Sequence, residues 1–154
     1  RVIEFRLPNS DQRLVISDAV FRHFEKYRQR EANAMEAGGQ LFARIESSTI
    51  LVTEATGPRQ KDFRSRFGFR SNRRLERKEI ALMFRRGLHY IGDWHTHPED
   101  HPVPSNEDVA SMVESFRQSR HQLAGFVMLI VGTSGDAGGL YIGICNKFGV
   151  FRLG

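Results

Sequence analysis

The sequence has a single cysteine, Cys145, and no apolar run near the roughly 20 residues that a membrane-spanning helix needs. One cysteine excludes a disulfide framework within the chain, which fits a protein of the reducing cytoplasm. Because Cys145 lies in the apolar run LYIGIC, a buried and unreactive thiol is expected. The first residues, RVIEFRLPN, lack the apolar segment of a signal peptide. We therefore predict a cytoplasmic protein that does not enter a membrane.

Repeats, low-complexity tracts and linker-like stretches are also missing from the chain. Its length of 154 residues corresponds to about one domain, and roughly two-thirds of the unfolded surface can be buried at this size. The hydrophobic fraction of 40% and the charged fraction of 27% are typical of a folded protein and argue against disorder. These properties predict a single domain over residues 1–154.

Negative charge is in the minority, because 23 lysines and arginines face 18 acidic residues and give a net charge of +5. Much of the excess lies in residues 59–78, where basic side chains are interleaved with Phe63, Phe67 and Phe69. Such a stretch could hold nucleic acid, contact a protein partner or form an ordinary solvated face. The solvated face is favoured, a protein contact comes second, and nucleic acid is the least favoured of the three.

Hydrophobic periodicity divides the chain into strands and three helices. Strands are predicted over 1–7, 38–46, 48–56, 63–70, 89–95, 123–132, 138–145 and 148–153, and helices over 17–34, 72–87 and 105–118. The apolar stripes expected to face the sheet are Leu75, Ile80, Met83 and Phe84 in the second helix and Val109, Met112, Val113 and Phe116 in the third. The order of elements predicts an α/β or mixed α+β domain in which helices flank a central sheet.

Two histidines separated by one residue lie at the end of the strand predicted over 89–95 and just beyond it. Side chains two apart on a strand point to the same face, so the imidazoles of His95 and His97 project together. Ser105 then begins a helix whose first turn contains Asp108. Two imidazoles and one carboxylate make the three protein ligands of a catalytic zinc site, which leaves the fourth position for water. His95, His97 and Asp108 are therefore candidate Zn²⁺ ligands.

A metal-dependent hydrolase also needs a carboxylate that is not a ligand and that moves protons during the reaction. Glu36 is the candidate, because Gly38 and Gly39 after it allow a tight turn and a close approach of the backbone. Spacing alone does not bring Glu36 to His95. The hydroxyl of Ser105 is the candidate for stabilising a developing oxyanion.

Ser105 and Asp108 also fit a capping box, in which the serine caps the helix and the acid caps back. One carboxylate cannot fully serve both roles, so we expect Asp108 to face the metal and to leave capping to Ser105 or the backbone. The nearby His101, Glu99 and Asp100 are expected to be loop residues rather than ligands or acid–base groups.

Three short patterns, Glu-x-Gly-Gly from Glu36, His-x-His-Pro over 95–98 and Ser-x-x-Asp over 105–108, together resemble the JAMM motif of the JAB-domain (MPN+) metalloproteases. The resemblance implies zinc held by the two histidines and the aspartate, with Glu36 as general acid/base and Ser105 stabilising the carbonyl oxygen. It also implies a cytidine-deaminase-like fold around the central sheet. The chemistry implied is hydrolysis of peptide or isopeptide bonds at the C-terminus of ubiquitin-like proteins.

The run YIGDWHTHPEDHPVPSNEDV is similar to a bacterial branch of this family, the JAB-domain deconjugating proteases of CBASS antiviral operons. In that branch an E1/E2-like protein joins the C-terminus of a nucleotidyltransferase to target proteins, and the JAB-domain protein reverses the conjugation. The resemblance therefore implies a protein substrate with a flexible C-terminal tail. Residues 57–72 and 98–104 would flank the site and select this tail, with the phenylalanines and arginines of 59–70 as candidate partner contacts.

Two other functions remain open at this point. A peptidase with the same chemistry could process a sulfur-carrier or phage-tail protein. The chain could instead be a non-catalytic module that binds a partner through its basic residues 59–78, although the complete motif counts against this.

Overall fold

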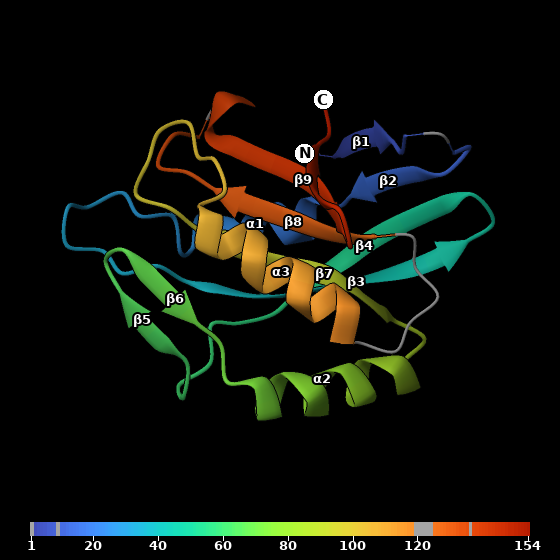
Figure 1. Ribbon diagram of the computed structural model, residues 1–154, viewed down its shortest axis with the longest axis horizontal. Helices are drawn as coiled ribbons and strands as arrows, with labels where there is room; N and C mark the ends of the chain where they lie inside the picture. Colours follow the sequence, from blue (N-terminus) through green and yellow to red (C-terminus); the bar gives the residue numbers. More distant parts are fainter. Residues whose placement is uncertain (1, 9, 119–124, 136) are drawn as a thin grey trace.

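An eight-stranded mixed sheet lies at the centre of the computed structural model (Figure 1). The structure describes residues 2–8, 10–118, 125–135 and 137–154. Across the sheet the strands follow the order β1-β2-β4-β3-β7-β8-β9-β10. Their bounds are β1 Ile3–Arg6, β2 Arg13–Ile16, β3 Gly38–Glu46, β4 Thr49–Ala55, β7 His89–Thr96, β8 Phe126–Val131, β9 Leu140–Asn146 and β10 Gly149–Arg152. With three α-helices beside the sheet, this confirms the predicted α/β class.

Two strand pairs in the sheet are parallel, β2 with β4 and β7 with β8, and the other pairs are antiparallel. A parallel pair needs a crossover connection, and helix α3 (Asn106–Gln118) lies in the one between β7 and β8. The crossover leaves the C-terminal end of β7, so α3 begins close to the residues that end this strand. Ligands in open α/β sheets bind at such ends, beyond the carboxyl termini of the strands.

The helices cover both faces of the sheet. Helix α1 (Asp18–Glu25) packs on one face, where Phe24 and Trp94 belong to the larger buried core. On the opposite face α3 contributes Met112 to a second apolar cluster, which includes Phe126 and Met128 of β8. Helix α2 (Arg73–Arg85) lies beside α3 along the lower rim of the molecule (Figure 1). β7 is therefore covered on both faces.

The helix predicted over 17–34 is wrong in length, because α1 ends at Glu25. The chain beyond it forms turns, which longer-range hydrogen bonds secure. Gln29 is 2% exposed, and its carboxamide donates to the carbonyl oxygens of Ala34 at 3.1 Å and Arg66 at 3.0 Å. A bond to the carbonyl of Arg66, 37 residues away, cannot be recognised from local periodicity.

Two further strand predictions are corrected. Residues 13–16 form β2, for which no strand was predicted, and 63–70 form a hairpin of β5 (Phe63–Ser65) and β6 (Gly68–Arg70). The hairpin makes a separate two-stranded sheet. β2, β5 and β6 have only three or four residues each, and alternation over so few residues is weak evidence for a strand. The strand predicted over 123–132 begins outside the described residues, and β8 is buried along its whole length as expected.

The inward stripe predicted for the second helix is partly wrong. Leu75, Ile80 and Met83 are half-buried, but Phe84 is 64% exposed and stacks edge-on against His89. The stripe of the third helix is confirmed, with Met112 buried and its neighbours half-buried. No helix in the described ranges is long and apolar enough to span a membrane.

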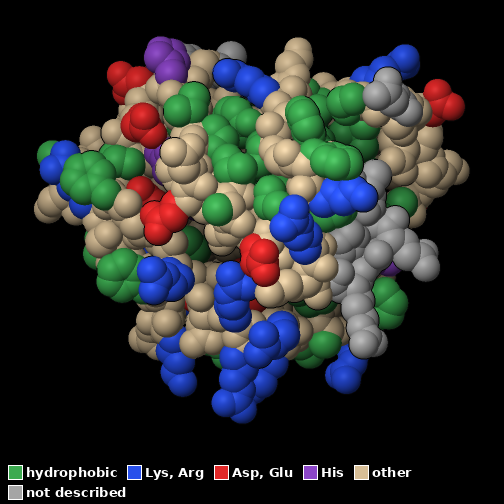
Figure 2. Space-filling model, viewed as in Figure 1, with side chains coloured by type: hydrophobic (Ala, Val, Ile, Leu, Met, Phe, Trp, Pro, Cys, Tyr) green, Lys and Arg blue, Asp and Glu red, His purple; other side chains and the backbone are tan. Residues whose placement is uncertain are grey.

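The basic stretch 59–78 divides into an exposed and a buried part. Figure 2 shows lysine and arginine side chains gathered along the lower edge, where Figure 1 places α2. Its Arg73, Arg74, Arg77 and Lys78 are exposed, as the favoured solvated face predicts. Arg59 instead turns inward, where its side chain is 12% exposed and pairs with Glu79 and Asp62.

Candidate active site

Antiparallel pairing of β3 with β7 brings the first motif residue to the histidines. Gly38 pairs with His95, and the Thr96 amide donates to the Ala37 carbonyl at 2.8 Å. The Ala37 amide in turn donates to Oγ1 of Thr96 at 2.9 Å. Continuing this register by two residues sets Glu36 opposite His97 on the same face. The approach of Glu36 to the histidines is thus a consequence of strand pairing.

The two glycines after Glu36 leave no room for side chains. A Cβ built on Gly38 would lie 2.7 Å from the Phe69 ring and 2.7 Å from the Trp94 carbonyl oxygen. A Cβ on Gly39, which points to the other face, would lie 1.7 Å from the carbonyl oxygen of Thr56. The close approach expected of this pair is therefore present on both faces of β3.

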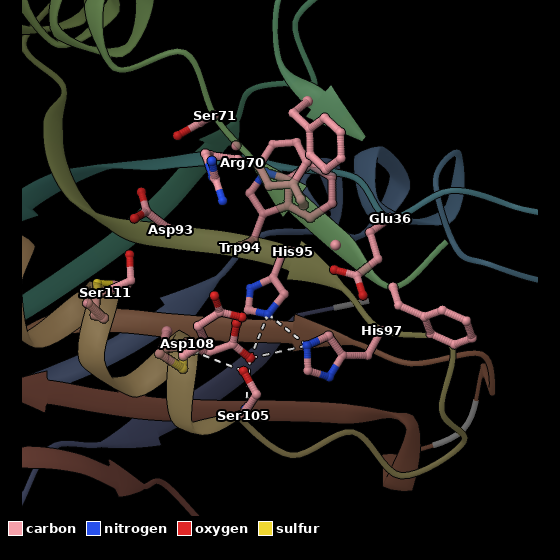
Figure 3. Close-up of a pocket in the computed structure, with 18 of the residues that line it drawn as sticks. Glu36, Arg70, Ser71, Asp93, Trp94, His95, His97, Ser105, Asp108 and Ser111 are labelled. Carbon is pink, nitrogen blue, oxygen red and sulfur yellow. Dashed lines mark hydrogen bonds and ion pairs between the residues drawn. The ribbon is translucent and has the colours of Figure 1, made fainter. Parts of the chain in front are cut away.

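The structure brings the side chains of His95, His97 and Asp108 together (Figure 3). The Nε2 atoms of the two histidines are 3.0 Å apart, and Oδ2 of Asp108 lies 3.2 Å from each of them. A tetrahedral zinc ion with bonds of roughly 2.0 Å separates its ligands by about 3.3 Å. The three donor atoms therefore fit one face of such a tetrahedron, and the donor set of two imidazoles and one carboxylate suits zinc.

Asp108 serves both roles that were expected to compete. Its Oδ2 accepts the Ser105 amide at 2.9 Å while it faces the histidines, and the Asp108 amide donates to Oγ of Ser105 at 3.0 Å. This is a complete capping box, so the expectation that Asp108 would leave capping to others is wrong. A carboxylate oxygen has two lone pairs, and one helix-capping bond leaves capacity toward the histidines.

Glu36 is 6% exposed, and Figure 3 shows its carboxylate directed into the space beside His95 and His97. Burial raises the pKa of Glu36 to about 7, partly opposed by His97 and reinforced by the charges of Asp108 and Glu99. A carboxyl with a pKa near neutrality can both accept and return a proton. This environment suits the acid–base role that was predicted for Glu36.

His95, His97 and Asp108, which we call the triad, interact through hydrogen bonds and opposite charges that shift the pKa values of His97 and Asp108. Burial acts to raise the pKa of Asp108, but hydrogen bonds and charge from His95 and His97 outweigh it and hold that pKa far below its usual range. Burial acts to lower the pKa of His97, yet Asp108, Glu36 and Glu99 raise it above its ordinary 6.5. Asp108 is therefore an anion that favours positive charge between the three donor groups.

Glu99 was expected to be a loop residue, but its Oε1 lies 2.9 Å from Nδ1 of His97. Metal-binding histidines commonly donate their second nitrogen to a carboxylate, which fixes the tautomer and the ring orientation. An acid two residues after His97 is the sequence signal that could have identified it. His101 and Asp100 behave as predicted, bonding respectively to the Gly138 carbonyl and to Thr133 within loops.

A cavity of about 660 Å³ extends from the triad between the β5–β6 hairpin, α2 and the start of α3. Phe63, Phe67 and Phe69 of the hairpin line it together with Asp93 of β7. The carboxyl of Asp93 accepts the Tyr90 hydroxyl at 2.9 Å, and burial raises its pKa. Asp93 was not among the predicted site residues, because its half-buried position depends on the hairpin and α2, which line the same cavity and come from other parts of the chain.

The comparison with protein families decides the affiliation of the chain. A profile of the prokaryotic homologs of the JAB domain matches residues 19–141. This chain belongs to the prokaryotic JAB-domain family. The match includes every position of the motif from Glu36 to Asp108, and the family resemblance drawn from that motif is confirmed.

Curated relatives of this JAB-domain protein carry the name CD-NTase/cGAS isopeptidase. One from Escherichia coli is 31% identical over 79% of this chain and 78% of its own length, and one from Enterobacter hormaechei is 34% identical over 72% and 62%. A third, from Vibrio cholerae, is 31% identical over 80% and 78%. A solution structure of a Desulfitobacterium hafniense protein matches with a TM-score of 0.61 at 20% identity, covering 89% of this chain and 87% of the other, which shows a shared fold.

Proposed function

We propose that this JAB-domain protein is a zinc-dependent isopeptidase that releases a CD-NTase from proteins to which its C-terminus has been conjugated, in CBASS antiphage defence. The observation that carries the proposal is the buried carboxyl of Glu36, which has a pKa of about 7 and faces three side chains whose donor atoms could hold a metal ion. The name of the curated relatives supports the substrate class.

His95, His97 and Asp108 would hold the zinc ion through the donor atoms whose separations fit it. When bound, zinc supplies a Lewis acid that polarises a carbonyl and lowers the pKa of water. Glu99 would keep the His97 ring in the tautomer that presents Nε2 to the ion. A chain without these donors would lack the centre altogether.

Glu36 moves the protons of the reaction in this proposal. Its carboxylate takes a proton from the attacking water as the water oxygen bonds to the scissile carbonyl carbon. As the C–N bond breaks, Glu36 returns that proton to the nitrogen of the departing lysine amine. The Oγ of Ser105 accepts the Asp108 amide, which leaves its hydroxyl hydrogen available for the developing oxyanion.

The tail of the substrate would reach the triad through the cavity beside the β5–β6 hairpin. This route places the extended C-terminus of the CD-NTase between the hairpin and α3, both of which line the cavity. The proposal includes a cytoplasmic location and a functional link to an E1/E2-like protein that forms the conjugate. The exposed basic face of α2 lies next to this route.

The test is cleavage of a CD-NTase that carries green fluorescent protein directly after its C-terminal residue. Glu36→Gln should lower kcat at least about 100-fold, because the proton carrier is lost, while zinc per chain stays at the wild-type level. Asp108→Asn should lose both activity and zinc. Glu114→Gln, an exposed change on α3 that removes a charge but keeps an acceptor for Gln118, is the matched control and should cleave normally. Full activity in Glu36→Gln would refute the proposal.

A further inference from the structure

The β5–β6 hairpin holds the main chain of Glu36 from both sides. The Glu36 amide donates to the Ser65 carbonyl at 2.7 Å, and Nε of Arg64 donates to the Glu36 carbonyl at 2.8 Å. Glu36 precedes β3, so neither of its main-chain groups belongs to the ladder of the central sheet. The bonds from β7 therefore stop at Ala37, and the main-chain groups of Glu36 itself are held by the hairpin.

Neighbouring contacts secure the hairpin against the same segment. The buried carboxamide of Gln29 joins the Ala34 carbonyl, two residues before Glu36, to the Arg66 carbonyl in the hairpin turn. Two residues after Glu36, the ring of Phe69 lies so close to Gly38 that no side chain fits between them. The segment around Glu36 and the hairpin thus contact each other at several points and should move as one body.

Arg64 has support of its own behind these contacts. Its guanidinium lies 6.0 Å from the centroid of the Tyr27 ring, within the range of a cation–π contact. Tyr27 in turn packs on Trp94 at a centroid distance of 6.1 Å, and Trp94 is 1% exposed in the core. Arg64 consequently links a rigid part of the core to the carbonyl of the residue that carries the acid.

We infer that Arg64 is a positioning residue for Glu36, which sets the carboxyl relative to the histidines through the main chain and does not itself touch the substrate. The inference rests on the proposed function, in which Glu36 carries the protons. Small misplacements of a reacting group are costly, since about 1 Å can lower a rate on the order of 100-fold. Loss of the Arg64 bond should therefore slow the chemical step and leave the substrate affinity and the metal centre in place.

The experiment compares Arg64→Gln with the wild type on the fluorescent CD-NTase fusion. We expect kcat to fall at least about 10-fold, with KM within about twofold and zinc per chain unchanged. Arg64→Lys keeps the charge and a donor, so its kcat should lie between the two, and it tests the inference even if Arg64→Gln does not fold. Arg117→Gln is the matched control, because Arg117 also donates to a main-chain carbonyl, that of Lys147, far from the site.

A kcat within twofold of wild type in both Arg64 variants would overturn the inference, as would a loss confined to KM or an equal loss in Arg117→Gln. A merely structural role would lower the melting temperature without separating kcat from KM. Glu36→Gln distinguishes a failure of the proposed function from a failure of the positioning role alone. If it remains active, the proposed function fails; if it is inactive while Arg64→Gln is normal, only the positioning role fails.

Discussion

Single side chains at this site have more than one partner. Oδ2 of Asp108 accepts the amide of Ser105 and lies 3.2 Å from both histidine Nε2 atoms. His97 presents one nitrogen to this cluster and the other to Glu99. Each group is thereby oriented before any ion binds, which lowers the conformational cost of forming the centre.

The carboxylate of Glu99 gives a prediction at the scale of one residue. Glu99→Gln keeps the size of the side chain but removes the charge that orients and polarises His97, so zinc affinity should fall about 10-fold or more. Competition with a chromophoric chelator measures this. Glu107→Gln, an exposed change beside Asp108, should leave affinity unchanged. Equal affinities for the two variants would count against a role for Glu99.

At the scale of elements, the pairing of β3 with β7 determines how close the acid comes to the histidines. Other segments also pack closely on β3, because Gly39 lets the Thr56 carbonyl approach one face and Gly38 lets the Phe69 ring approach the other. The crossover from β7 to β8 then places the start of α3 at the same end of the sheet. One pairing and one crossover are sufficient to assemble residues from three parts of the chain.

The tight packing on β3 can be tested by stability. In Gly39→Ala the new methyl carbon would lie 1.7 Å from a main-chain oxygen, which cannot rotate away, so the backbone must shift. We expect the free energy of unfolding to fall by at least about 2 kcal/mol. Urea denaturation measures this change. Gly135→Ala, where no atom lies within 4 Å, should change stability by less than about 0.5 kcal/mol; similar values for both variants would refute the packing argument.

For the whole molecule, the candidate metal centre connects β7 to α3, two elements on either side of a long loop. An ion that binds only the folded chain stabilises it by an amount that grows with the logarithm of the free ion concentration once this exceeds the dissociation constant. Zinc requires neutral imidazoles, so protons compete with it for His97. The pKa of His97 is raised above 6.5, and competition therefore extends to higher pH than for an ordinary histidine.

Zinc at about 100 times its dissociation constant should stabilise the fold by roughly 2.7 kcal/mol, a rise in Tm of about 5–10 °C. The rise should be complete well above the pKa of His97 and shrink as pH falls through it. In the zinc-free protein the contribution of His97 to stability should depend on pH in the opposite direction. A raised histidine pKa stabilises the fold below pH 6.5, and this contribution is lost as pH rises through the raised pKa.

Scanning calorimetry with zinc and with chelator, over a pH series, measures both trends. Asp108→Asn should abolish the zinc-dependent rise at every pH, since the carboxylate that faces both histidines is gone. A rise that is independent of pH, or one that survives in Asp108→Asn, would place the bound zinc elsewhere on the chain.

Much of the fold and of the candidate site could be predicted because the relevant patterns are local. The buried strand β8 is an apolar run in the sequence, and the inward face of α3 is a set of apolar residues at helical spacing. Strand geometry sets His95 and His97 on one face, and helix geometry sets Asp108 three residues after its cap. α1 is shorter than predicted, β2 was not predicted, and β5 and β6 were predicted as one strand. Contacts between distant segments, such as the bond from Gln29 to the Arg66 carbonyl in the hairpin turn, leave no local period.

Local offsets, such as the spacing of His95 and His97 on a strand, can be interpreted from the amino-acid sequence alone, since backbone geometry fixes the repeats of strands and helices. The folded chain was needed to show that Glu36 lies opposite His97, that Glu99 contacts the His97 ring, and that the hairpin holds the acid by its main chain. These contacts join distant segments or depend on the path of a loop. They follow from which strands pair and how loops close, and no local period carries that information.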